Sequence, residues 1–150
     1  MTNESRDISF ERRSITCAAA RRLIDSVIRH ADERNWRVAV AVVDVSGNIV
    51  ASGRMDGAPP TVAEFACDKA YTASMLNKST RAFFERMASS AELTMGLANR
   101  RRLLCWEGGL PIVSNGVVIG GVGVSGASGP EDAECAAIAL AALGLASTEA

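Results

Sequence analysis

The sequence has few of the residues from which several common kinds of functional site are built. It contains one histidine, His30, and four scattered cysteines, Cys17, Cys67, Cys105 and Cys135, with no C-x-x-C pair. A Cys/His zinc site and a Ser-His-Asp or Cys-His triad therefore lack a convincing set of residues. A single imidazole leaves a weak candidate for an axial haem ligand, whereas a histidine near a helix end more commonly interacts with the last carbonyls.

The sequence also lacks an excess of charge and a long apolar run. It has 16 basic and 17 acidic residues, so we expect neither nucleic acid nor an anionic membrane as a partner. No apolar run approaches the roughly 18 residues of a membrane-spanning helix. The first residues are polar and do not resemble a secretory signal, which predicts a cytoplasmic protein with reduced cysteines.

The length and composition predict one globular domain. The chain has 150 residues, of which 48% are hydrophobic, enough for a sizeable core. We expect a single domain over residues 1–150 that is ordered from about residue 8 to 147, with polar, frayed ends.

Hydrophobic periodicity predicts alternating helices and hairpins. We expect a helix capped by Ser14 and closed by Asn35, and a later helix opened by a Thr61–Glu64 capping box. Residues 91–109 show no clean period and are predicted to be mostly loop, with a short strand near 103–105. The remaining predicted elements are a hairpin over 38–55, a short helix from Ser79, a hairpin over 110–126 and a final helix from Pro130.

This order predicts an α+β fold. Two antiparallel hairpins would form a sheet of about five strands flanked by helices, and no βαβ unit is present. The sequence "VVIGGVGVSG" contains G-x-G-x-x-G at Gly121, Gly123 and Gly126. A dinucleotide site would also need a following strand that ends in an acidic residue, which is missing here. The glycines instead indicate a place where either a packed helix or a ligand approaches the sheet closely.

A few polar residues stand out against this framework. Arg54 and Asp56 share one face at the end of a strand. Lys69 lies on the apolar stripe of its predicted helix, where it would either extend outward or pair with a buried carboxylate, with Asp56 as the suggested partner. Tyr71 and Thr72 could line the same site. The residues alone leave open whether the pair is structural or functional.

Two stretches resemble a known family. "VAVVDVSGNIVASGRMDGAPPTVAEFACDKAYTAS" and "GGLPIVSNGVVIGGVGVSGASGPEDAECAAIAL" are similar to the GlcG/HbpS family, also called the haem-degrading domain family, which includes the C-terminal domain of some corrinoid adenosyltransferases. The resemblance implies a profilin-like domain, a homo-oligomer with an even number of subunits, and haem as a ligand. The positions that match the family motifs are Arg54, Asp56, Gly57, Lys69, Thr72, Gly108, Gly109, Pro111, Gly121, Gly123 and Gly126.

Two functions follow as hypotheses. The first is an oligomeric cytoplasmic protein that binds a small ligand, such as haem or a related tetrapyrrole. The second is a catabolic isomerase, tautomerase or hydrolase that acts on a small organic acid. In that enzyme Lys69 or Asp56 would transfer a proton, Arg54 would hold a carboxylate, and the N–H groups of Gly108 and Gly109 would stabilise an oxyanion.

Overall fold

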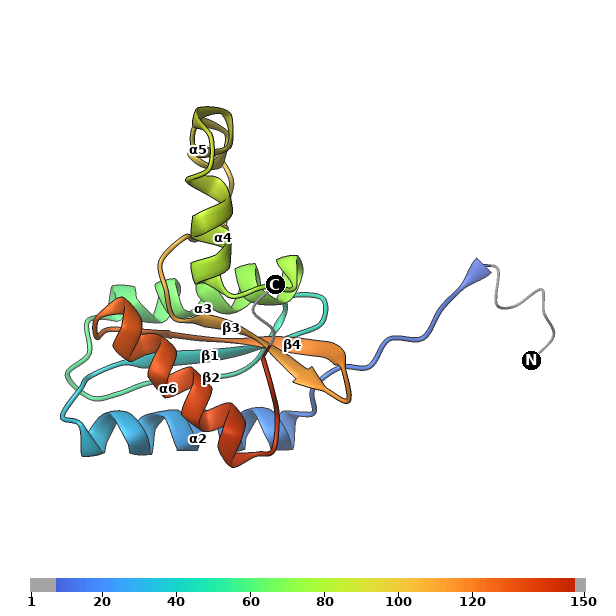
Figure 1. Cartoon of the computed structure of the whole chain (residues 1–150). Coiled ribbons are helices and arrows are strands. Elements are labelled where there is room, and N and C mark those ends of the chain that lie inside the picture. Colours follow the sequence, from blue (N-terminus) through green and yellow to red (C-terminus); the bar gives the residue numbers. More distant parts are fainter. Residues whose placement is uncertain (1–7, 148–150) are drawn as a thin grey trace.

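The computed structural model describes residues 8–147, which form one antiparallel sheet covered by helices on both faces (Figure 1). The predicted frayed ends at residues 1–7 and 148–150 lie outside the described residues. Helix α3 covers one face of the sheet, and α2 and α6 cover the other. The elements in chain order are α2 (Cys17–Glu33), β1 (Ala39–Asp44), β2 (Ile49–Arg54), α3 (Pro60–Leu76), α4 (Thr80–Met87), α5 (Ala91–Leu97), β3 (Gly109–Ser114), β4 (Val117–Ser125) and α6 (Gly129–Ala142).

The sheet has the order β2-β1-β4-β3, and every neighbouring pair is antiparallel. Strand β1 lies inside the sheet, and its side chains alternate between the two cores. Val40 and Val42 pack in the core with α2 and α6, whereas Ala41 and Val43 pack beneath α3. Because both faces of the strand are covered, its sequence has almost no polar alternation.

The predicted α+β class and both hairpins are confirmed, but the sheet has four strands and not about five. Residues 103–105 form no strand, and much of the predicted loop before them is α5. No residue of α5 is buried, so the helix leaves no apolar period in the sequence. The Ser90 side chain instead caps it by accepting a hydrogen bond from the Leu93 N–H.

Two of the predicted helix caps are wrong, although both helices are present. Thr16 caps α2, while the Ser14 hydroxyl accepts a hydrogen bond from the Val45 N–H. Helix α3 begins at Pro60 without a side-chain cap, so the Thr61–Glu64 capping box does not form. The predicted end of the first helix is confirmed, because Asn35 takes a left-handed conformation and donates to the Asp32 carbonyl.

The glycines of β4 create a flat surface for α3. A Cβ atom at Gly121 would overlap the Ala70 carbonyl oxygen, and one at Gly123 would overlap the Ala66 carbonyl oxygen. Helix packing therefore accounts for these two positions of the G-x-G-x-x-G sequence. Within residues 8–147, no helix is both long and apolar enough to cross a membrane.

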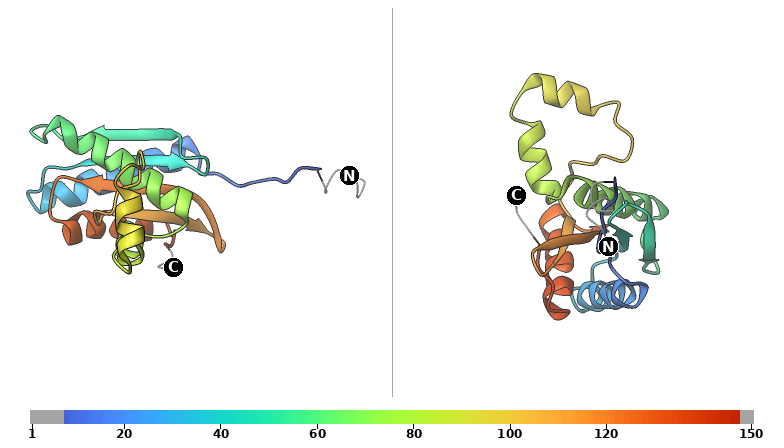
Figure 2. Two further views of the ribbon diagram at one scale, coloured as in Figure 1. Left: turned by 90° about the horizontal axis from the view of Figure 1, so that it is seen from above. Right: turned by 90° about the vertical axis from the view of Figure 1, so that its right-hand side faces the viewer.

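Helices α4 and α5 form an arm that stands away from the sheet and its covering helices (Figure 2). Phe84 and Met95 of this arm are exposed. A largely apolar cavity of about 390 Å³ lies at the arm and is lined by Leu76, Phe83, Met87, Glu92, Leu93, Gly96, Leu97, Arg100 and Leu103. The arm therefore has apolar side chains that the fold of this chain leaves uncovered.

Candidate functional site

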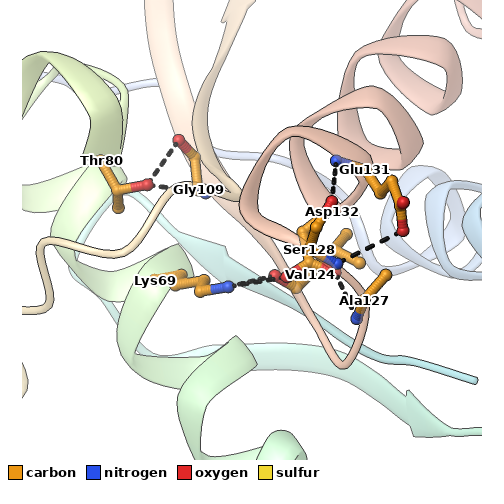
Figure 3. A network of polar contacts seen from close by, with 8 residues as sticks. All are labelled: Lys69, Thr80, Gly109, Val124, Ala127, Ser128, Glu131 and Asp132. Carbon is orange, nitrogen blue, oxygen red and sulfur yellow. Dashed lines mark hydrogen bonds and ion pairs between the residues drawn. The ribbon is translucent and has the colours of Figure 1, made fainter.

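A buried ion pair joins α3 to the start of α6. The Lys69 ammonium lies 3.1 Å from Oδ2 of Asp132, and the two side chains are 2% and 3% exposed. The same Nζ donates to the Val124 carbonyl oxygen at 2.9 Å (Figure 3). The sequence prediction named Asp56 as the partner of Lys69, and the structure corrects it to Asp132.

Local structure at the start of α6 holds Asp132 in place. Its Oδ1 accepts a hydrogen bond from the Ala127 N–H at 3.0 Å, while Ser128 and Glu131 form a capping box around it (Figure 3). Asp132 therefore serves two partners, a backbone N–H and the ammonium of Lys69. This leaves its carboxylate well satisfied despite its burial.

Gly108 packs directly against the Lys69–Asp132 ion pair. Its φ of +129° is rarely adopted by other residues, and a Cβ there would lie 3.0 Å from Nζ of Lys69 and 2.9 Å from Cβ of Asp132. Only glycine leaves room for the ion pair beneath this turn.

Burial shifts the pKa of both partners away from the charged state. It lowers the pKa of Lys69, against the attraction of Asp132 and Glu107, and it raises the pKa of Asp132, against the attraction of Lys69. The pair can therefore exchange a proton more readily than an exposed lysine and aspartate.

A cavity of about 340 Å³ adjoins the ion pair. We name it the Lys69 pocket; it is lined by Val62, Lys69, Trp106, Glu107, Ser125, Gly126, Ala127, Gly129 and Asp132. Its charged lining residues are one lysine and two acids, so it does not favour an anion. Trp106 is half exposed and meets the Phe65 ring edge to face.

Ser125 is the unsatisfied polar group of this pocket. It is 5% exposed, and its hydroxyl makes no hydrogen bond within residues 8–147. Ser125 follows Gly121 and Gly123 at a spacing of two, so it lies on the α3 face of the sheet, near Lys69. A buried hydroxyl normally has a partner, and a polar ligand in the Lys69 pocket would supply one.

Arg54 and Asp56 lie in a different cavity. It measures about 590 Å³, and its lining consists of Asp25, Ile28, Arg29, Asp32, Arg37, Arg54, Met55 and Asp56. The Arg54 guanidinium donates to the Ala58 carbonyl oxygen at 2.7 Å. The structure therefore brings Arg54 and Asp56 together but does not bring either of them to Lys69.

Several other predicted ligand-binding residues have structural contacts. Thr72 donates to the Arg102 carbonyl oxygen and accepts from the Leu104 N–H, which fixes the loop that leads to β3. The Tyr71 ring lies 3.9 Å beneath the guanidinium of Arg102. Pro111 is buried in β3, beside Gly121 of β4. None of these residues lines the Lys69 pocket.

The predicted oxyanion donors are only partly available. The Gly109 N–H donates to Oγ1 of Thr80 at 3.0 Å, so it is already engaged (Figure 3). The Gly108 N–H has no hydrogen-bond partner in the described part of the chain, but its carbonyl accepts from the Val124 N–H. A donor pair at Gly108 and Gly109 is therefore not preformed.

His30 is engaged in an ion pair. Its Nε2 lies 2.9 Å from Oε2 of Glu134, its side chain is 11% exposed, and Trp36 meets its ring edge to face. The hydrogen bond from His30 lowers the pKa of Glu134. His30 lines neither of the two cavities described above. Residues 8–147 also contain no group of three or more His, Cys, Asp or Glu side chains arranged to hold a metal ion.

Sequence reasoning missed Asp132, Ser125 and Glu107 as site residues; for Trp106 it favoured core or interface packing over contact with an apolar ligand. Asp132 shares its helical face with the buried Cys135, Ala136 and Ala139, and that spacing of three, four and seven could have identified it as buried. Glu107 and Trp106 lie in an irregular loop, where no periodic signal exists.

Comparisons with known proteins agree with this fold. The model of the family described as "Haem degrading protein HbpS-like" matches residues 15–141. A 15.0 kDa protein from the dhaT-dhaS intergenic region of Citrobacter freundii is 38% identical over 92% of this chain and 95% of its own length. Protein GlcG of Escherichia coli is 37% identical over 63% of this chain and 69% of its own length.

Solved structures extend the comparison. The crystal structure of HbpS superposes with a TM-score of 0.83 at 32% identity, covering 91% of this chain and 95% of that one. A haem complex of PduOC shares the fold with a TM-score of 0.81 at 24% identity, covering 91% of this chain and 99% of that one. By its sequence and its fold, this chain belongs to the HbpS-like family.

Proposed function

We propose that this chain is a small-ligand-binding protein of the HbpS type and that its ligand occupies the Lys69 pocket. The observation that carries the proposal is the buried Lys69–Asp132 ion pair, which lines a cavity together with Ser125, a buried residue whose hydroxyl has no hydrogen-bond partner among residues 8–147. Ionic groups are costly to bury, and ionisable groups with pKa values shifted by burial cluster in the clefts of functional sites. This combination is the strongest functional signal in the molecule.

Trp106 offers a direct test of this proposal. The chain contains two tryptophans, and only Trp106 lines the Lys69 pocket. In a Trp36→Phe variant, fluorescence reports on the pocket alone. Titration with small aldehydes, ketones, alcohols and carboxylic acids should give a saturable change for one class of compound. The change should weaken when Ser125→Ala is added, because alanine lacks the hydroxyl and adds no atom to the buried position.

An unaltered titration in the Ser125→Ala variant would contradict the proposed site. So would the absence of a saturable change with all four classes of compound. Arg54→Gln serves as the matched control, because it alters the other cavity and should leave the response unchanged.

Haem is the ligand that the relatives suggest, since the family is described as haem degrading and PduOC has been solved with haem. The residues of this chain do not fit axial ligation by His30, because its Nε2 is bonded to Glu134 and the side chain is nearly buried. Haem binding would therefore have to use another residue or a surface between copies of the chain. Absorbance titration with hemin tests this directly.

A saturable Soret shift at a fixed hemin-to-subunit ratio would support haem as the ligand. Its loss in His30→Ala would restore the predicted role of His30, whereas its persistence would assign ligation to another residue. Weak and non-saturating binding would remove haem from consideration and leave the Lys69 pocket as the site to search.

The proposed binding protein is a cytoplasmic homo-oligomer with an even number of subunits. The α4–α5 arm supports self-association, because it projects from the body and exposes Phe84 and Met95 (Figure 2). Light scattering should give a mass of an even number of chains. Met95→Asp should reduce that mass, and a monomeric wild-type protein would contradict the proposal.

A cofactor-independent isomerase or tautomerase is the second candidate, and the opposed pKa shifts of Lys69 and Asp132 favour it. These two residues would transfer the proton, with Asp132 in the role first given to Asp56. Proton magnetic resonance in D₂O tests it: hydroxyacetone should exchange its C–H protons faster with wild-type protein than with Asp132→Asn. Equal rates would contradict catalysis by this pair.

A further inference from the structure

The Lys69 amine has the surroundings of a nucleophile. In its neutral form it carries two N–H protons, and two acceptors lie within hydrogen-bond distance, the Val124 carbonyl oxygen at 2.9 Å and Oδ2 of Asp132 at 3.1 Å. These two hydrogen bonds would engage both N–H protons. The nitrogen lone pair would then point away from both acceptors and be free to attack a ligand. Lys69 also lines the Lys69 pocket, but its side chain is only 2% exposed, so a small molecule reaches the amine when the pocket lining moves aside.

From this arrangement we propose that Lys69 captures small neutral aldehydes or ketones as a Schiff base in the Lys69 pocket. This inference rests on the proposed function of the same pocket and names its class of ligand. A lysine whose ammonium form is disfavoured by burial is the type of residue that forms such adducts. Asp132 is the neighbouring acid and base that the reaction needs.

The bonds and protons of the reaction balance without a cofactor. The lysine nitrogen donates its lone pair to the carbonyl carbon, and the π electrons of the C=O bond move to oxygen. One amine proton passes to Asp132 and then to that oxygen, giving a carbinolamine. Loss of the hydroxyl with a second proton releases one water and forms the C=N bond, so the oxidation states do not change.

The pocket selects for neutral and hydroxylated compounds. Once Lys69 is neutral, the remaining charges of the lining are the carboxylates of Glu107 and Asp132, which repel an anionic ligand. Ser125 and Glu107 can hydrogen-bond a ligand hydroxyl, while Val62 and Trp106 contact its carbon atoms. The organic-acid substrate predicted from the sequence relied on Arg54, which lies in the other cavity.

The chain allows an unusually direct test, because it contains only two lysines, Lys69 and Lys78. Wild-type protein is incubated with glycolaldehyde and sodium cyanoborohydride, which reduces an imine to a stable secondary amine, and the modified residue is located by peptide mass spectrometry. We expect the adduct mainly on Lys69, although Lys78 is the more exposed lysine. Lys78→Arg should keep the adduct, and Lys69→Arg should lose it.

Glyoxylate is the matched anionic probe, because it has two carbons and an aldehyde like glycolaldehyde. We expect less adduct on Lys69 with glyoxylate. A label confined to Lys78 and the N-terminal amine would overturn the proposal, and so would equal labelling of Lys69 by the two probes. Mapping the wild-type protein keeps the test valid even if Lys69→Arg folds poorly.

The Trp106 titration separates this inference from the proposed function. A saturable Trp106 response to glycolaldehyde without an adduct on Lys69 would keep the binding site and refute the Schiff base. A failure of both measurements would refute the site itself. An adduct on Lys69 together with a Trp106 response supports both.

Discussion

Breaking the Lys69–Asp132 pair should destabilise the protein far more than removing an exposed charge. Lys69→Met leaves Asp132 buried without its cation, while Asp132→Asn keeps the acceptor for the Ala127 N–H and leaves Lys69 without its anion. Removal of one partner from a buried pair costs about 3–5 kcal/mol. We expect the lower end of that range, because burial already moves both pKa values toward the neutral forms.

The double variant Lys69→Met with Asp132→Asn contains neither charge. Its free energy of unfolding should therefore fall by less than the sum of the two single changes, with a coupling of about 1–3 kcal/mol. Each single variant should lower Tm by about 6–12 °C, from about 2–4 °C per kcal/mol for a domain of this size. Lys78→Met is the control and should change stability by less than about 0.5 kcal/mol.

Urea unfolding followed by circular dichroism measures all four proteins. Single variants that lose less than about 1 kcal/mol would show that the pair is not buried in solution, since breaking a buried pair costs several times as much. Additive losses in the double variant would show that the two side chains do not interact.

Three further predictions use other parts of the structure. Gly123→Ala should cost about 1–3 kcal/mol of stability in urea unfolding, because its Cβ would overlap the α3 backbone. Gly96→Ala in exposed α5 is the control and should stabilise the protein by about 0.5–1 kcal/mol. Equal effects of the two substitutions would refute close packing of β4 against α3. A colorimetric thiol reagent should label exposed Cys17 first and leave Cys135 unmodified until the protein unfolds. Burial excludes the reagent from Cys135 and raises the pKa of its thiol to about 12. Early labelling of Cys135 would contradict its burial. Acetylation of Lys69 by a trace of acetic anhydride should accelerate as pH rises, because only the deprotonated amine reacts. Burial should place the midpoint below the ordinary lysine pKa of about 10.4 despite the facing acids Asp132 and Glu107. A midpoint at or above that value would contradict a desolvated lysine.

Much of the fold could be predicted from the sequence because its elements carry local signals. The first helix, the hairpin over 110–126 and the final helix from Pro130 all follow from short stretches of sequence, and the structure confirms them. Helix α5 could not be predicted in this way, since it buries no residue and leaves no period to detect.

The candidate site was only half predictable. Lys69 could be identified because it is a charged residue on the apolar stripe of its helix, and that pattern is contained in one short segment. Its partner could not be identified, because the pairing of β1 with β4 decides whether Asp56 or Asp132 comes near, and that pairing joins residues about 80 positions apart. Ser125 became visible only when the strand register placed it on the α3 face beside the lysine.

The most direct measurement is a crystal structure of the wild-type protein after trapping with glycolaldehyde and cyanoborohydride. We expect continuous density from Nζ of Lys69 into the Lys69 pocket, with the ligand hydroxyl within hydrogen-bond distance of Ser125 or Glu107. An intact Lys69–Asp132 pair with an empty pocket and ligand bound only beside Arg54 or His30 would contradict the assignment of this pocket as the functional site.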